Sequence, residues 1–235
     1  MSALRFDILT VFPEMFESPL SSGVVGRALK NQIIDVNCLD IRLFTEDHHK
    51  SVDDYPFGGG GGMILKPEPI FKAVDHLKQK SSLKESDPII LLSPQGRKLN
   101  QRQAEILSNN ERIVLICGRY DGVDERVVKH LVTDEISIGD YVISGGELAA
   151  MVLIDCLARL QQDALGSAES IEDDSHTSGL LQFPQYTRPS VYRDWEVPDV
   201  LLSGNHKEIK KFREMESIKR TLQRRPDLFH GRDIN

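Results

Sequence analysis

Runs of β-branched and aliphatic residues alternate along the chain with segments of helical spacing. Five strands are predicted, at residues 6–12, 34–39, 88–93, 112–117 and 135–143. Four helices are predicted between and after them, at residues 69–79, 101–108, 124–131 and 147–160. Strands that alternate with helices indicate a largely parallel sheet with helices on both faces. The pattern therefore predicts an α/β fold up to about residue 160.

The character of the chain changes after this point. Residues 161–178 contain Gly166, four serines and a cluster of four acids, which is typical of a linker or of a solvated acidic loop without chemistry. We therefore predict a main domain at residues 1–164, a flexible acidic linker at 165–177 and a small helical domain at 178–235. The parts are unequal in size, as expected for a main domain with an appendage.

A basic segment lies near the end of the chain. Residues 205–225 hold eight Lys or Arg and three Glu, a local net charge of +5 in a protein whose net charge is −7. Five apolar residues fall on one half of a helical wheel: Ile209, Phe212, Met215, Ile218 and Leu222. We predict an amphipathic helix with a basic outer face. Such a face is usually only solvated, and nucleic acid or an anionic membrane are the alternative readings.

The composition, with 40% hydrophobic and 28% charged residues, is that of a folded protein. The first residues lack a secretory signal and no uncharged apolar stretch reaches membrane-spanning length, so a cytoplasmic protein is expected. Cys38, Cys117 and Cys156 are widely spaced among apolar neighbours, which favours small buried side chains over a disulfide or a zinc site.

Five consecutive glycines occupy positions 58–62, more than a simple turn needs. Close approach of the backbone to a ligand explains them better. No P-loop lysine follows, and no G-x-G-x-x-G fingerprint follows any strand, which argues against nucleotide hydrolysis and against a dehydrogenase. The nearby Asp47, His48 and His49 have no metal-ligand spacing, so no protein-bound metal is expected there.

Three predicted strand ends carry similar loops, at residues 93–96, 118–122 and 138–146. Ligands of open α/β sheets bind outside the carboxyl ends of the strands, so these loops predict one shared pocket, although glycine-rich loops also occur in purely structural turns. The helix from Glu147 begins directly after Gly145 and Gly146, which leaves free backbone amides near that pocket.

Several long motifs then point to a known family. They are the opening strand with Phe-Pro-Glu-Met-Phe at 12–16, Leu-Ser-Pro-Gln-Gly-Arg-Lys at 92–98, Cys-Gly-Arg-Tyr-Asp-Gly-Val-Asp-Glu-Arg at 117–126, residues 137–147, and Tyr-Thr-Arg-Pro at 186–189. In order and spacing the chain, from residue 6 to about 228, closely resembles the bacterial tRNA (guanine-N1)-methyltransferases of the knotted SPOUT class.

The resemblance implies a deep trefoil knot in the main domain, an exception to the rule that chains are unknotted. It also implies that S-adenosylmethionine sits bent in the pocket predicted above. The residues matched to its binding are Pro94, Gly118, Tyr120, Asp121, Gly122, Ile138, Gly139, Asp140, Tyr141, Val142, Ile143, Gly145 and Gly146.

The substrate that the resemblance implies is the guanosine immediately 3′ of the anticodon in tRNA. By motif match Asp174 is the general base that removes the N1 proton, and Arg159 stabilises charge on the guanine oxygen. Another reading of Arg159 is an i, i+4 pair with Asp155 on the helix surface. The family acts as a homodimer with shared sites.

RNA contacts are expected from two regions. The basic helix would bind phosphates, and the loop with the five glycines at 58–62, named the glycine loop, would meet the extruded guanine. The residues involved are Lys207, Lys210, Arg213 and Arg220 on the helix, and Asp53 or Asp54, Gly59 and Gly60 at the loop.

Two positions depart from the family pattern. Gln182 stands where an acidic residue is usual, which leaves a requirement for Mg²⁺ open, and Asp121 stands where many relatives carry Glu. The alternatives to the implied activity are a SPOUT-class methyltransferase for another RNA base and a non-catalytic tRNA-binding module.

Overall fold

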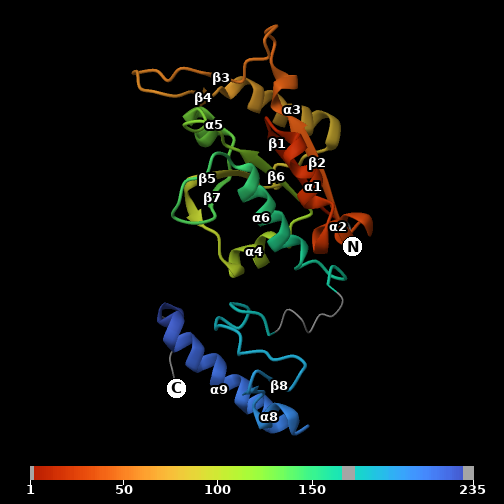
Figure 1. Cartoon of the computed structure of the whole chain (residues 1–235). Coiled ribbons are helices and arrows are strands. Elements are labelled where there is room, and N and C mark those ends of the chain that lie inside the picture. Colours follow the sequence, from red (N-terminus) through yellow and green to blue (C-terminus); the bar gives the residue numbers. More distant parts are fainter. Residues whose placement is uncertain (1–2, 166–172, 230–235) are drawn as a thin grey trace. The chain divides into compact units, whose positions relative to one another are not determined.

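The structure is a computed structural model that describes residues 3–165 and 173–229. The chain divides into two compact units, Met1–Gly166 and Ser167–Asn235 (Figure 1). Residues 166–172 of the predicted acidic linker lie outside the described residues.

The first unit is built on a five-stranded sheet with the order β2-β1-β6-β5-β7, in which all neighbours are parallel. The strands are β1 (Leu4–Thr10), β2 (Ile34–Asp40), β5 (Ile89–Lys98), β6 (Arg112–Cys117) and β7 (Asp134–Ser137). Every residue of the central strand β6 is buried, as expected for a parallel strand that is covered on both faces. The predicted α/β fold is confirmed.

Helices cover both faces of this sheet. On one face α2 (Gly23–Lys30), α4 (Gln101–Leu107) and α6 (Glu147–Ala158) share a core with Phe6 and Ile8 of β1. On the other face α3 (Pro67–Ser81) and α5 (Glu125–His130) share a core with Leu9 of the same strand. Alternate strand residues point to opposite faces, so one strand supplies both cores.

Short elements connect these parts. They are η1 (Pro13–Phe16), α1 (Glu17–Leu20), η2 (Ile41–Phe44) and the two-stranded pair β3 (Asp53–Asp54) and β4 (Ile64–Leu65), which is joined by the glycine loop (Figure 1).

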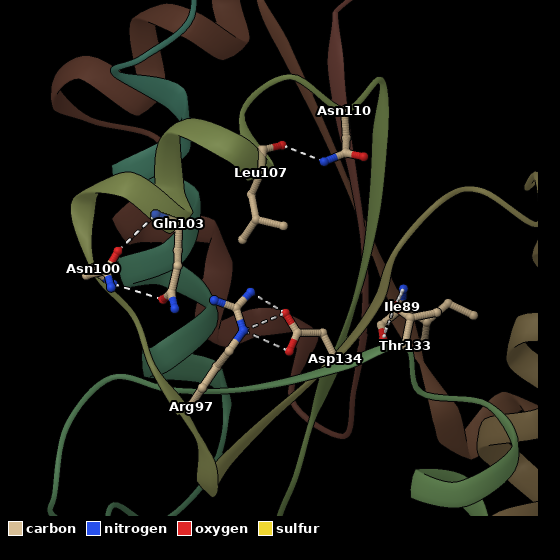
Figure 2. A network of polar contacts seen from close by, with 8 residues as sticks. All are labelled: Ile89, Arg97, Asn100, Gln103, Leu107, Asn110, Thr133 and Asp134. Atoms are coloured by element: carbon tan, nitrogen blue, oxygen red, sulfur yellow. Dashed lines mark hydrogen bonds and ion pairs between the residues drawn. The ribbon is translucent and has the colours of Figure 1, made fainter.

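Polar contacts join β5 to the region of β7, and others cap the N-terminus of α4, the helix that follows β5 (Figure 2). The Arg97 Nε donates to Asp134 Oδ1 at 3.0 Å, and the Ile89 N–H donates to Thr133 Oγ1 at 2.9 Å. Asn100 and Gln103 form a capping box at the N-terminus of α4. Ile136 of β7 pairs with both Leu92 and Arg97, so residues 93–96 leave the ladder as a bulge. The bulge places this loop at the carboxyl edge of the sheet.

Four of the predicted strands and all four predicted helices of the first unit are present, with ends shifted by a few residues. The strand predicted at 135–143 is wrong beyond Ser137. The Ser137 hydroxyl hydrogen-bonds with the backbone of Gly139, whose φ is +155°, and the chain turns away from the sheet. Helix α2 and the β3–β4 pair were not predicted.

The second unit contains β8 (Val191–Tyr192) and β9 (Trp195–Glu196), α8 (Asp199–Leu202), α9 (His206–Arg224) and η3 (Pro226–Phe229). Helix α9 is the predicted amphipathic helix, with Asn205 as its N-cap. Thr221 of this helix is buried, and its hydroxyl oxygen accepts a hydrogen bond from the Leu181 N–H at 2.9 Å. Met215, Ile218 and Leu222 of the predicted apolar half are exposed.

Candidate active site

The loops at residues 93–96, 118–122 and 138–146, named the pocket loops here, follow or interrupt β5, β6 and β7. They enclose a cavity of about 290 Å³, and its floor is made by apolar residues such as Leu91, Leu92 and Ile136. An apolar cavity with convergent backbone polar groups is the usual form of a small-molecule site. The residues predicted for ligand binding that line it are Pro94, Gly118, Tyr120, Asp121, Gly122, Ile138, Gly139, Tyr141, Val142, Ile143, Gly145 and Gly146.

One residue of the predicted set does not line this cavity. Asp140 is exposed, and its carboxylate pairs with the Lys98 ammonium group at 2.6 Å. This exposed pair connects the third pocket loop with the end of β5 at the surface.

A buried ion pair joins the second and third pocket loops. Arg119 Nε donates to Glu147 Oε2 at 3.0 Å, and Arg119 Nη1 donates to the Ser144 carbonyl at 3.2 Å. The other carboxylate oxygen of Glu147 accepts from the Thr10 hydroxyl at 2.8 Å. The Arg119 guanidinium also lies 4.5 Å from the centroid of the Phe12 ring. These contacts tie both loops to the carboxyl end of β1, and Glu147 sits in the first turn of α6, where a negative charge is favourable.

Sequence reasoning did not identify this group. In the sequence, Arg119 belongs to the loop motif at 118–122, Glu147 to the predicted helix that follows residue 146, and Thr10 to the first predicted strand. The sequence does contain one signal for this pair. Two loops that are predicted to share one pocket carry or adjoin residues of opposite charge, Arg119 and Glu147.

Glycine is required where these loops approach one another. A Cβ on Gly145 would lie 2.3 Å from Arg119 Nε, and a Cβ on Gly146 would lie 2.7 Å from Cys117 Cα. The Gly146 N–H donates to the Gly118 carbonyl at 2.8 Å, so the two loops are in direct backbone contact. The free backbone amides predicted at the start of α6 are therefore partly used inside the site.

We expect Gly146→Ala to lower the free energy of unfolding by about 1–3 kcal/mol, the usual cost of overpacking a close contact. The new methyl group would meet backbone atoms that cannot move aside. Gly61→Ala is the control, because an added Cβ there meets no described atom within 4 Å. Thermal and urea unfolding measure the difference, and equal stability of the two variants would contradict this account of the contact.

The glycine loop is connected to the same site. The Asp121 N–H donates to the Met63 carbonyl at 3.0 Å, and the Leu65 N–H donates to the Gly122 carbonyl at 3.0 Å. Gly62 has φ +90°, and a Cβ there would overlap the Asp121 carboxylate. The glycine loop and the second pocket loop therefore form one continuous wall. Gly59 and Gly60 also have positive φ and are exposed at its tip.

Tyr120 is held by both parts of this wall. It has φ +59°, and its backbone bridges to Ile64 of β4. Burial and the nearby Asp53 carboxylate raise the pKa of Tyr120, so the phenol stays protonated and remains a hydrogen-bond donor at neutral pH. Asp54 is exposed at the start of the loop.

The two residues predicted to act on the substrate belong to different units. Arg159 is the C-cap residue of α6 in the first unit. Asp174 lies in the second unit, where it lines a hollow of about 700 Å³ together with Gln182, Lys210 and Arg213.

The cations predicted to bind RNA lie along α9. Lys207 and Lys210 are exposed. Arg213 lies 4.7 Å from the centroid of the Phe183 ring and 3.9 Å from an Asp173 carboxylate oxygen, and Arg220 Nη1 donates to the Gln182 carbonyl at 3.5 Å. Arg213 and Arg220 are therefore already engaged in contacts within the unit, and the two exposed lysines are better placed to bind an anionic ligand.

Among the described residues, no three His, Cys, Asp or Glu side chains are grouped closely enough to hold a metal ion. Within residues 3–165 and 173–229, no helix is both long and apolar enough to cross a membrane.

Comparison with known proteins identifies relatives of the whole chain. Residues 4–231 match the family model described as tRNA (Guanine-1)-methyltransferase TrmD. A tRNA (guanine-N(1)-)-methyltransferase of Dehalococcoides mccartyi strain CBDB1 is 54% identical over 226 residues, 96% of this chain and 90% of the relative. One of Halalkalibacterium halodurans is 50% identical over 232 residues, 98% of this chain and 93% of the relative. The crystal structure of the tRNA (m1G37) methyltransferase of Aquifex aeolicus superposes with a TM-score of 0.78 at 40% identity, covering 97% and 95% of the two chains.

Proposed function

Because the chain belongs to the tRNA (guanine-1)-methyltransferase TrmD family, we propose that it transfers the methyl group of S-adenosylmethionine to N1 of the guanosine immediately 3′ of the anticodon. That it is an enzyme methylating a tRNA guanine at N1 follows from the family. The donor, the position of the guanosine and the residues that act on it are the proposed part. The position is supported by the Aquifex relative, a tRNA (m1G37) methyltransferase.

The cavity between the pocket loops is the observation that carries the proposal. Its apolar floor suits an adenine ring, and its glycines leave backbone N–H and C=O groups within reach of polar ligand edges. S-adenosylmethionine would supply the electrophilic methyl group. Pro94, Gly118 and the third pocket loop would hold and bend it, and the Arg119–Glu147 pair would keep the loops at the spacing that this requires.

The reaction also requires that a residue of the enzyme remove the proton from N1 of the guanine. N1 of guanine is protonated at neutral pH, so a base has to remove this proton as the methyl group arrives. We assign this role to Asp174, while Arg159 stabilises the negative charge that develops on the guanine oxygen. The glycine loop with Asp53 or Asp54 would contact the extruded guanine. A homodimer in the cytoplasm, with Asp174 of one subunit acting at the donor of the partner subunit, completes the proposal.

The proposal includes no requirement for Mg²⁺. At Gln182 the family's usual carboxylate is replaced by an amide, which binds a divalent cation more weakly. The Gln182 N–H donates to the Ser175 hydroxyl oxygen at 3.0 Å, and its backbone carbonyl faces Arg220. The side chain that replaces the carboxylate is a neutral amide, so titration with chelator is expected to change activity little.

Mapping the methyl group on modified tRNA tests the proposal directly. Transcripts with guanosine or adenosine 3′ of the anticodon are incubated with S-adenosylmethionine and digested to nucleosides. We expect N1-methylguanosine only from the first transcript. Methylation of another base would indicate a different SPOUT-class activity, and binding without methylation would indicate a non-catalytic tRNA-binding module.

Reversing Lys207 and Lys210 to Glu is expected to weaken tRNA binding and to lower the salt slope of log Kd by roughly one unit per lost phosphate contact. Both side chains are exposed on α9. The matched control reverses Lys78 and Lys80, which are exposed on α3 of the first unit. Filter binding at several salt concentrations measures the effect. Equal losses in the two double variants would indicate a general charge effect and not a phosphate contact by α9.

A further inference from the structure

The β8–β9 hairpin exposes two aromatic rings that no step of the proposed mechanism uses. Every residue from 185 to 196 is exposed, and Tyr192 and Trp195 have exposed fractions of 55% and 68%. The two residues are directly opposite in the antiparallel register, so their side chains share one face of the hairpin. Their ring centroids are 6.2 Å apart with an interplanar angle of 54°.

The turn of the hairpin adds a cation to these rings. Arg193 and Asp194 both have positive φ, at +52° and +65°, as a two-residue turn between twisted strands requires. Asn and Gly are the residues that adopt this conformation most easily, and arginine adopts it at a cost. In this position the Arg193 guanidinium lies 5.3 Å from the centroid of the Tyr192 ring. The turn thus places a cation beside Tyr192 and leaves Trp195 open.

An isolated hairpin with strands of two residues is only marginally stable, and exposed rings do not add to a core. Flat aromatic faces next to a guanidinium group are what proteins use to stack on unpaired nucleotides and to contact their phosphates. The same unit carries the exposed lysines of α9.

We propose that the β8–β9 hairpin is a stacking site for an unpaired nucleotide of the tRNA, with Trp195 covering the base and Arg193 near its phosphate. This inference rests on the proposed function, since it takes tRNA as the ligand. A second copy of the chain is the competing occupant. A stable protein interface buries on the order of 1,200–2,000 Å², and two rings at the end of a short hairpin supply a small part of that area.

Trp195 is the only tryptophan of the chain, so its intrinsic fluorescence reports on the hairpin directly. Titration with an anticodon stem–loop RNA is expected to quench this fluorescence and to saturate at the RNA concentration where filter binding saturates. Unchanged fluorescence at saturating RNA would overturn the proposal. A fluorescence change on dilution of the protein without RNA would assign the hairpin to a second copy instead.

Trp195→Ala is expected to raise the Kd for tRNA by about 5- to 150-fold, the effect of losing one base–aromatic stack. Trp195→Phe keeps a ring and should lose less, and Leu202→Ala, an exposed apolar residue of α8, should leave the Kd unchanged. Abasic substitutions along the RNA loop should reveal one position that weakens wild-type binding but has no effect on Trp195→Ala.

N1-methylguanosine formation by the wild-type enzyme is measured in the same preparations. If the wild type methylates guanine N1 and Trp195→Ala binds tRNA equally well, only the stacking site is wrong. If the wild type forms no N1-methylguanosine, the proposed function itself fails, and the stacking site loses its premise with it.

Discussion

Replacing Asp174 by Asn is expected to lower the single-turnover rate of methyl transfer by about 10²- to 10⁴-fold, the usual contribution of a general base. The amide keeps the size of the side chain but cannot accept the N1 proton. The affinity for S-adenosylmethionine should not change, because Asp174 is outside the residues that line the cavity between the pocket loops. Rapid-quench assays at saturating donor and tRNA measure the rate, and isothermal calorimetry measures donor binding.

The control for this variant is its neighbour. Asp173→Asn removes an equal charge from the same segment, and Asp173 makes an exposed ion pair with Arg213, at 3.9 Å. Such pairs contribute little, so we expect nearly the wild-type rate. A wild-type rate for Asp174→Asn, or equal losses in both variants, would remove Asp174 from the role of base.

Replacing Glu147 by Gln is expected to lower the free energy of unfolding by about 3–5 kcal/mol, because it leaves the Arg119 charge without its buried partner. The exposed fractions of the Glu147 and Arg119 side chains are 0% and 16%, so water screens this pair poorly. Binding of S-adenosylmethionine should weaken as well, since the pair holds two pocket loops together. Urea unfolding and donor calorimetry measure the two effects.

Two further variants separate stability from positioning. Glu125→Gln removes an exposed carboxylate that pairs with Lys129 on the surface of α5, and it should cost little. The double variant Arg119→Met with Glu147→Leu removes both buried charges and should recover much of the lost stability. It also loses the contact from Arg119 to the Ser144 carbonyl, so donor binding should stay weak. Full recovery of donor binding would show that the pair is only structural.

The extent to which the sequence predicts this protein depends on where the partners of each residue lie. Strand β6 was located to the residue, because five consecutive apolar positions follow Arg112 and a helix-forming segment lies on each side. The strand at 135–143 was extended too far, because Ile138, Val142 and Ile143 have strand-like character and the turn depends on bonds between Ser137 and Gly139. The exposure of Met215, Ile218 and Leu222 on α9 could not be predicted either. Helical periodicity shows on which side of a helix the apolar residues lie, but it does not show whether another element covers them.

The sequence by itself determined the α/β architecture, the gathering of glycine-rich loops at the carboxyl ends of three strands, and, through its long motifs, the family. Only the tertiary structure decided how those loops are held. The Thr10 hydroxyl meets the Glu147 carboxylate across 137 residues of chain, and Arg119 reaches the same carboxylate across 28. Likewise, the Asp121 carboxylate occupies the space that Gly62 leaves free. Local spacing carries periodicity and turn chemistry, whereas a buried charge finds its partner only when packing has brought distant strands and helices together.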